Sequence, residues 1–236
     1  MLVVPIDWAC NDKPLWNPLF GSVKTYYEDQ QSSKEAGRVL EKFLRGLKLD
    51  GQKLNVVAHS MGNRVLRYVG KSAVVDWDRD ALQSGSLLLD AAVPPEGSNI
   101  HEHLFDNIFF VAADIPATVF DAPTDGEEEE QSEHALKSGI AALAVMTERM
   151  HVLHANFNDI ALNASFALNE SSRRLGSRGP NNVWETIEEK VTILDCSEWN
   201  HKGDIALGHN YSTYKKAVAY YHEQMVAMDN SNPNPD

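Results

Sequence analysis

The amino-acid sequence predicts an α/β fold, in which a mostly parallel sheet carries helices on both faces. Short aliphatic runs typical of buried parallel strands alternate with segments whose apolar residues recur every three or four positions, as in amphipathic helices. Strands that alternate with helices pair in parallel, because the crossover helix returns the chain to the same end of the sheet. The length of 236 residues, with 43% hydrophobic content, is enough for one domain with a substantial core. We expect this domain to span residues 1–228 and a disordered Asn- and Pro-rich tail to span residues 229–236.

In the first part of the chain, two predicted strands flank a helix. Residues 2–6 form a short apolar strand, which a polar loop follows to about residue 21. Between residues 33 and 47 the apolar residues recur at helical intervals, which predicts an amphipathic helix. Residues 53–57 have the aliphatic composition of a second, buried strand. Residues 71–105 stay unassigned, because a Pro-Pro-Glu-Gly segment interrupts their apolar run.

The second part of the chain continues the alternation. Three further strands are predicted, at residues 108–113, 151–157 and 191–194. A helix of about four turns is marked by Leu136, Ile140, Leu143 and Ala144. An acidic loop at residues 121–133 precedes this helix, and a polar loop covers residues 171–182. The final helix carries an apolar stripe from Tyr214 to Met228.

The charge of the chain excludes several classes of partner. With 34 acidic and 21 basic residues, the formal net charge is −13 at pH 7. This charge repels phosphate backbones and anionic lipid surfaces, so we expect no nucleic-acid partner. No stretch approaches the ~20 apolar residues that a membrane helix needs, and the N-terminus does not resemble a signal peptide. We therefore expect no membrane span and a cytoplasmic location.

The cysteines give no sign of a disulfide framework or a metal site. Cys10 and Cys196 are the two cysteines, and they lie far apart without metal-type spacing. Acyl transfer through a serine nucleophile also requires neither a metal ion nor an organic cofactor. We therefore expect metal and cofactor to be absent.

The sequence pattern that says most about function is the abrupt change from a predicted strand to a predicted helix at Ser60. An aliphatic run reaches Ser60, and a helical apolar stripe begins directly after it. Ala58 and Gly62, two residues before and two after, are small enough for strand and helix to cross closely, in the form A-x-S-x-G instead of the commoner G-x-S-x-G. Such a nucleophile elbow holds the serine hydroxyl clear of the backbone. Ser60 is therefore the candidate nucleophile.

A histidine must accept the proton of a serine before its hydroxyl becomes a good nucleophile. Among nine histidines, His209 has the most suitable position, between the last strand and the last helix and directly after Gly208. His59 is adjacent to Ser60 but is expected to point the opposite way along the bend. His209 is therefore the candidate base.

A carboxylate orients the base and stabilises its protonated form. Asp159 follows the strand at residues 151–157, so the chain order is serine, acid, histidine, as in the hydrolase sheet. Asp114, at the end of the preceding strand, is the alternative acid, and Asp195 is a third choice. The N–H of Met61, the residue after the nucleophile, is the first candidate donor to the oxyanion that forms during acyl transfer.

Six short segments, spread in order over nearly the whole chain, carry a resemblance to a known family. They are Val4-Pro-Ile-Asp-Trp8, Tyr26-Tyr-Glu-Asp29, Ala58-His-Ser-Met-Gly-Asn-Arg64, Ala112-Ala-Asp114, Asn158-Asp-Ile-Ala-Leu162 and Gly208-His-Asn-Tyr211. With these segments the chain resembles the α/β-hydrolase superfamily, and within it a bacterial family of hydrolases of unassigned function. The resemblance implies hydrolysis of a carboxylic ester or a related acyl transfer, with Ser60, Asp159 and His209 as the catalytic triad.

The sequence departs from the superfamily at its N-terminal side. The superfamily usually has further strands, including one followed by a loop that donates the second oxyanion N–H, and we expect this strand to be missing from the sequence. The fold is thus expected to be an N-terminally shortened hydrolase fold. A loop at Trp8, a partner chain, or a longer parent protein could supply the missing donor.

These observations lead to two functional expectations. The first is a serine esterase that cleaves a small-molecule ester through an acyl-serine intermediate. The second is a non-catalytic or weakly active protein with a hydrolase-like fold, used for binding or assembly. A sheet shortened on one side exposes a strand edge, which would favour a homodimer.

Overall fold

The computed structural model of the chain describes residues 5–6, 21–47, 49, 52, 54–75, 104–121, 139–155, 159–169, 172–199, 209, 211 and 214–231. The loop that contains Trp8, most of the unassigned stretch at residues 71–105, and the acidic loop beyond Asp121 lie outside these residues. Of the strand predicted at residues 2–6, only Pro5 and Ile6 are described, and neither belongs to a strand. Ile6 is 57% exposed, so the part of this prediction that can be checked is wrong.

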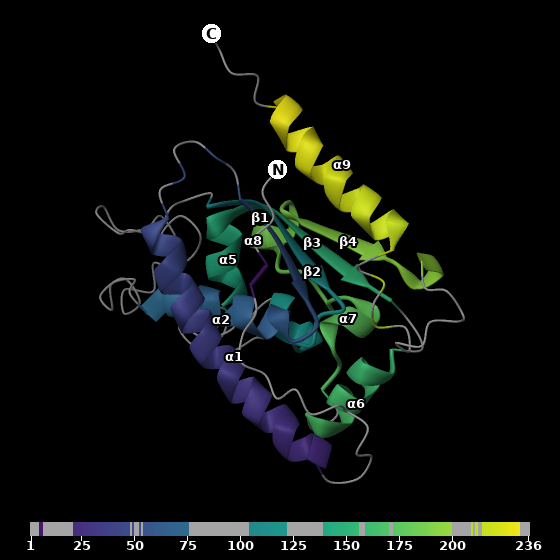
Figure 1. Ribbon diagram of the computed structural model, residues 1–236. Coiled ribbons are helices and arrows are strands. Elements are labelled where there is room, and N and C mark those ends of the chain that lie inside the picture. The colour runs from purple at the N-terminus through teal and green to yellow at the C-terminus, as the bar shows by residue number, and fades with distance from the viewer. Residues whose placement is uncertain are drawn as a thin grey trace.

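Four parallel strands form one sheet in the order β1-β2-β3-β4 (Figure 1). They are β1 (Leu54–His59), β2 (Phe105–Val111), β3 (Thr147–His154) and β4 (Val191–Asp195). Each pair of neighbours is parallel and consecutive in the sequence. The parallel α/β fold that the sequence predicted is therefore confirmed.

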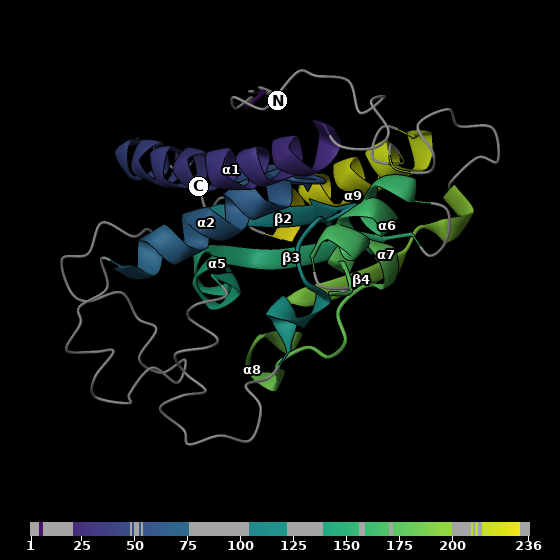
Figure 2. The same ribbon diagram turned by 90° about the horizontal axis from the view of Figure 1, so that it is seen from below.

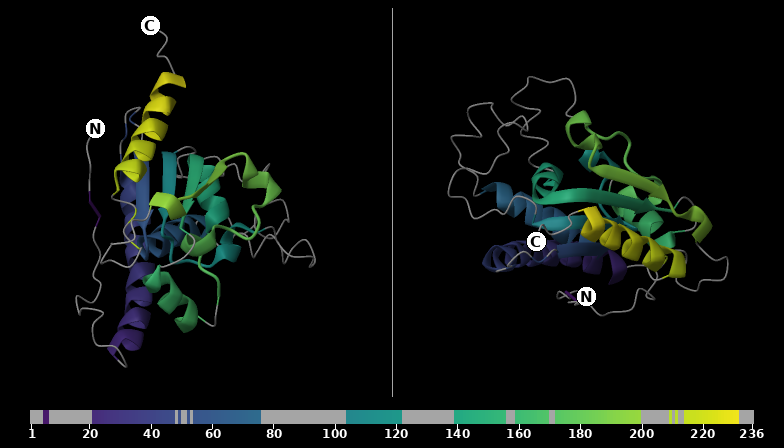
Figure 3. Two further views of the ribbon diagram at one scale, coloured as in Figure 1. Left: turned by 90° about the vertical axis from the view of Figure 1, so that its right-hand side faces the viewer. Right: turned by 90° about the horizontal axis from the view of Figure 1, so that it is seen from above.

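Helices cover both faces of this sheet. On one face, α1 (Gly21–Gly46) lies along α2 (Gly62–Val75), and α5 (Ile140–Met146) packs beside α2 (Figure 2). On the other face, α9 (Lys215–Ser231) lies against the sheet (Figure 3). The remaining elements are short: η2 (Ala117–Phe120), α6 (Ile160–Leu168), α7 (Leu175–Arg178), α8 (Glu185–Glu188) and η3 (Ser197–Trp199).

The burial of β2, one of the two inner strands, explains why the core has two layers. Successive side chains of a strand point to opposite faces, and six of the seven residues of β2 are buried. Ile108 and Phe110 belong to the core on the α2 and α5 face. Phe109 and Val111 belong to the core on the α9 face, together with Tyr221. A strand that is apolar on both faces can lie only between two layers of helices.

Several boundaries differ from the sequence-based predictions. β3 begins at Thr147, four residues before the predicted start, and the described part of the helix before it is the seven-residue α5. α1 begins at Gly21, well before residue 33, and α9 continues to Ser231, beyond the predicted domain end at residue 228. Helix α6 was not predicted, and α7 lies within the predicted polar loop.

A chain of polar side chains crosses the sheet on the α9 face. The Asn107 amide donates to Asn55 Oδ1 at 2.7 Å, and His151 Nε2 donates to Asn107 Oδ1 at 3.0 Å. The Tyr220 hydroxyl of α9 then donates to His151 Nδ1 at 2.9 Å. Burial lowers the pKa of His151 to about 4, with the nearby positive charge of Arg149 adding to the effect. His151 is therefore neutral in the folded protein at pH 7.

The burial of His151 predicts that the protein is less stable at acidic pH. The unfolded chain binds a proton at this histidine more readily than the folded chain, so stability falls as the pH drops below the unfolded pKa. Between pH 7 and pH 5, His151 should lower the free energy of unfolding by about 2 kcal/mol. Urea unfolding at both pH values measures this difference. The variant His151→Gln should show a smaller loss, whereas His222→Gln, at an exposed position of α9, should show the wild-type loss. Equal losses in all three proteins would contradict the prediction.

Gly176 of α7 allows a close approach between α7 and the end of β2. Its N–H donates to Ala113 O at 2.9 Å, and a Cβ at this position would overlap the backbone of Ala112 and Ala113. Gly176→Ala should therefore lower the free energy of unfolding by about 1–3 kcal/mol, because backbone atoms cannot move aside cheaply. Gly46→Ala is the matched control, since nothing lies within 4 Å of its Cβ. A loss of the same size in both variants would rule out the steric explanation.

Candidate active site

Ser60 lies in a tight turn between the end of β1 and the start of α2. Its φ is +52°, in the left-handed region that non-glycine residues rarely adopt. Its N–H donates to Val111 O at the end of β2 at 3.0 Å, and its carbonyl accepts from the Asn63 N–H at 3.2 Å. The buried Asn63 amide also donates to the carbonyls of Ser60 and Val111. The sharp bend that the sequence predicted here is present, and β2 stabilises it.

Two polar groups at this bend bear on the candidate nucleophile, the Ser60 hydroxyl and the Met61 N–H. Within the part of the chain that the structure describes, neither the Ser60 hydroxyl nor the Met61 N–H makes a hydrogen bond. Ser60 and Met61 are both half-buried. Trp8, the candidate for a second donor, lies outside the described residues.

His209 and Asp159 are in direct contact. His209 Nδ1 lies 2.7 Å from Asp159 Oδ2, and the side chains are 14% and 3% exposed. The other oxygen of Asp159 accepts from the Leu162 N–H at 2.9 Å, which makes Asp159 the N-cap of α6. The partial positive charge at a helix N-terminus favours a carboxylate there. Both oxygens of Asp159 therefore have partners, one of them the histidine that the sequence had paired with it.

His59 contacts the backbone of His209. A carbonyl can only accept, so His59 Nε2 donates to His209 O, at 2.9 Å. The two rings lie 4.8 Å apart with an interplanar angle of 59°. Burial lowers the pKa of His59, so its ring is neutral near pH 7. His59 is the residue before Ser60, so this contact places His209 next to the bend.

Tyr211 anchors the same segment to the ends of two strands. Its hydroxyl donates to Leu153 O of β3 at 2.7 Å and accepts from the Ala112 N–H at 2.8 Å. The side chain is fully buried, and this burial raises the pKa of Tyr211 well above its usual value. A neutral hydroxyl thus satisfies one polar group at the end of each strand. His209, two residues earlier in the chain, is kept close to the sheet.

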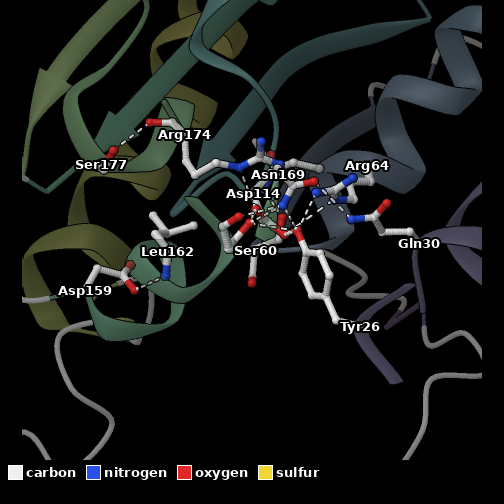
Figure 4. A network of polar contacts seen from close by, with 12 residues as sticks. Tyr26, Gln30, Ser60, Arg64, Asp114, Asp159, Leu162, Asn169, Arg174 and Ser177 are labelled. Atoms are coloured by element: carbon white, nitrogen blue, oxygen red, sulfur yellow. Dashed lines mark hydrogen bonds and ion pairs between the residues drawn. The ribbon is translucent and has the colours of Figure 1, made fainter. Parts of the chain in front are cut away.

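Asp114, the alternative acid, lies at the centre of a different polar cluster (Figure 4). Arg174 Nε donates to Asp114 Oδ1 at 2.9 Å, and the two side chains are 2% and 3% exposed. Ser165 of α6 donates to the same oxygen. The other oxygen accepts from the Tyr26 hydroxyl at 2.9 Å and from Arg64 Nε at 3.4 Å. Within the described part of the chain, Asp114 makes no contact with a histidine.

The Asp114 cluster joins distant elements to the bend. Tyr26 of α1 accepts from Arg64 Nη2 of α2 at 2.6 Å and from Asn169 Nδ2, just after α6, at 2.8 Å. The Asp114 N–H donates to the carbonyl of Ser60 at 3.2 Å, and Figure 4 shows Ser60 beside Asp114. The cluster therefore supports the turn at Ser60 by direct contact.

Most members of this cluster were not found from the sequence. The partners of Asp114 lie 50 to 88 residues away in the chain, and no local pattern connects them. Arg174 was one of several polar residues in a predicted loop.

Asp195, the third candidate acid, is exposed, and it accepts from the Ser197 N–H at 2.9 Å. In the described residues there is no group of three or more His, Cys, Asp or Glu side chains arranged to bind a metal ion. Nor does any helix described have the length and apolar character needed to span a membrane.

The buried charge of Asp114 predicts a large stability effect. Asp114→Asn removes the charge opposite Arg174 and leaves a buried guanidinium without a counter-ion, which should cost about 3–5 kcal/mol of unfolding free energy. Glu35→Gln breaks the solvent-exposed pair with Arg38 and should cost less than about 1 kcal/mol. Chemical denaturation measures both values. Equal losses of unfolding free energy in both variants would show that burial does not determine how much the ion pair of Asp114 and Arg174 contributes to stability.

The comparison with protein families returned one match over most of the chain. Residues 14–228 match the model of a family described as "Alpha/beta hydrolase of unknown function (DUF900)". Searches of curated proteins and of solved structures gave no match. The family match includes β1 to β4, the bend at Ser60 and the contact between His209 and Asp159. The chain therefore belongs to the DUF900 family of α/β hydrolases.

Proposed function

We propose that the protein is a serine esterase that cleaves a small carboxylic ester, with Ser60 as nucleophile, His209 as base and Asp159 as orienting acid. The observation that carries this proposal is the contact of 2.7 Å between His209 Nδ1 and Asp159 Oδ2, beside the strained turn at Ser60. A carboxylate on Nδ1 sets the tautomer in which Nε2 is free to accept a proton. Membership of an α/β-hydrolase family supports the same chemistry.

The proposed reaction has two steps. His209 Nε2 takes the proton of Ser60 as the hydroxyl oxygen attacks the ester carbonyl carbon. The tetrahedral intermediate then expels the alcohol, which receives that proton from His209, and leaves an acyl group on Ser60. In the second step a water molecule attacks the acyl group while His209 again accepts and returns a proton. The carboxylic acid leaves and Ser60 is restored.

The Met61 N–H, which makes no hydrogen bond within the described part of the chain, supports a role in stabilising the oxyanion. At a strand-to-helix bend, the N–H of the residue after the nucleophile faces the developing negative charge. The candidate sources of the second donor are the Trp8 loop, a partner chain and a longer parent protein. Loss of one such donor typically costs on the order of 10²- to 10³-fold in rate, so the second donor bears strongly on the proposed activity.

The contacts of the two buried aspartates favour Asp159 over Asp114 as the acid. Asp159 has one oxygen at a helix N-terminus and one at His209. The oxygens of Asp114 are occupied by Arg174 and Ser165 on one side and by Tyr26 and Arg64 on the other. A carboxylate that neutralises arginines has little charge left to stabilise a histidine cation.

A second candidate function, assembly without catalysis, is favoured by the position of β1 at the edge of the sheet that the described strands form. Among the described strands, β1 pairs only with β2, and Val57 of β1 is 44% exposed. An unpaired strand edge can pair with another chain, which would produce a homodimer. A folded protein that reacts with no phosphonate and sediments as a dimer would favour this candidate over the esterase.

The esterase proposal predicts which substitutions abolish activity. Ser60→Ala should reduce the hydrolysis of short p-nitrophenyl esters by at least about 10³-fold, because the nucleophile is lost. Asp159→Asn should reduce kcat by about 10³- to 10⁴-fold, because an amide favours the wrong tautomer of His209. Initial rates over a range of ester concentrations measure both effects. Ser32→Ala, in α1, is the matched control and should keep the wild-type rate.

Covalent labelling provides the independent check. A fluorophosphonate should modify the wild-type protein on the peptide that contains Ser60, and mass spectrometry identifies this site. Label on another residue, or wild-type hydrolysis by Ser60→Ala, would exclude Ser60 as the nucleophile. If Asp114→Asn stays folded and loses activity like Asp159→Asn, the assignment of the acid to Asp159 is wrong.

A further inference from the structure

We propose that His59 is a positioning residue for the base, because its ring N–H binds the backbone carbonyl of His209 and fixes the place of this residue next to Ser60. The proposal rests on the proposed function, since it takes His209 as the base. It assigns to His59 no contact with the substrate. The following paragraphs give the geometry that supports it.

The strand geometry of β1 directs the His59 side chain toward the α9 face of the sheet. His59 pairs with Val111 and Val57 pairs with Phe109 in the register between β1 and β2. Paired residues of neighbouring strands point to the same face, and Phe109 and Val111 belong to the core on the α9 side. Tyr211, which lies two residues after His209, belongs to the core on the same face. His59 can therefore contact His209 while Ser60, the next residue, turns away into the bend.

His59 and His209 contact one another through different groups. His59 Nε2 donates to the His209 carbonyl at 2.9 Å, and His209 Nδ1 contacts Asp159 at 2.7 Å. Thus His59 binds the backbone of the base, and Asp159 binds its ring. Tyr211 anchors the segment two residues later. These contacts fix the position of the His209 backbone and the rotation of its ring, and leave Nε2 as the one ring nitrogen without a partner in the described residues.

The protonation state of His59 suits this role. Burial is the largest effect and lowers the pKa of His59, while its hydrogen bond to His209 O and the negative charge of Asp159 act in the opposite direction. A positive charge on His209 lowers the pKa of His59 further. Neutral His59, with its proton on Nε2, can donate to the carbonyl without repelling the imidazolium that His209 becomes during the reaction. A protonated His59 would oppose this charge at a ring distance of 4.8 Å.

Two substitutions separate the hydrogen bond from the ring. His59→Phe keeps an aromatic ring but removes the donor, whereas the side-chain amide of His59→Gln retains a donor near the position of Nε2. His59→Phe should lower kcat by about ten- to a hundredfold with little change in KM, because a small displacement of the base affects the reaction more than binding. His59→Gln should restore kcat to within about threefold of the wild-type value. His222→Phe, at an exposed position of α9, is the matched control and should keep the wild-type kcat.

Nitrogen-15 NMR of the histidine rings tests the same proposal without using activity. The wild-type protein should show His59 as the neutral Nε2–H tautomer at pH 7.5, and His209 should show an Nδ1–H proton at low field from its bond to Asp159. This low-field signal should broaden or shift in His59→Phe and persist in His59→Gln. This difference between the two variants would support the positioning role of His59 even if neither the wild-type protein nor the variants hydrolysed esters. A lack of hydrolysis would count only against the esterase proposal.

Three results would overturn the proposal. The first is a wild-type kcat and an unchanged His209 signal in His59→Phe. The second is an equal loss of kcat in the Phe and Gln variants, which would point to the packing of the ring instead of its hydrogen bond. The third is an Nδ1–H tautomer of His59 in the wild-type protein, and this measurement decides the question if His59→Phe does not fold.

Discussion

The Asp114 carboxylate binds four side chains that come from widely separated parts of the sequence. Tyr26 lies in α1, Arg64 in α2, Ser165 in α6 and Arg174 at the start of α7. Removing a carboxylate and a guanidinium from water is costly unless the two ions are well paired and further hydrogen-bonded. Here each oxygen of Asp114 has more than one donor. The arrangement of the helices around the carboxyl ends of β1 and β2 therefore depends on this one buried charge.

The two buried aspartates near the bend, Asp114 and Asp159, have different kinds of partner. Asp114 is paired with the guanidinium groups of Arg174 and Arg64. Asp159 has a helix N-terminus and a histidine as its partners, so its surroundings can respond when a proton reaches the histidine. The first arrangement stabilises structure, and the second is suited to proton transfer. The bend at Ser60 lies between them, because the Asp114 N–H binds its carbonyl and His59 links it to His209.

Local sequence patterns were sufficient for the parts of the fold in which one short segment determines its own structure. The aliphatic run of β2, the apolar stripe of α2 and the small residues around Ser60 all lie within a few positions of one another. The Asp159 to His209 pairing was predictable because both residues follow strands of a parallel sheet, whose carboxyl ends lie together. Neither the role of Tyr26 nor that of Arg174 could be predicted. Each depends on a contact with Asp114, and the first 12 residues of α1, which contain Tyr26, have no apolar stripe to reveal the helix. The contact between His59 and the His209 carbonyl was not predicted either, because the two residues lie 150 positions apart in the chain.

The hydroxyl of Tyr211 has a consequence for the dynamics of the site. By binding both the Ala112 N–H and Leu153 O, it connects the segment of His209 to the two central strands. Proteins open in cooperative units, and surface loops usually open at a much lower free energy than the central strands of a sheet. Because the Tyr211 hydroxyl binds both strand ends, we expect Tyr211 to open together with the sheet. The base of the proposed triad would then share the slow hydrogen exchange of the core, and its alignment would persist until the protein unfolds as a whole.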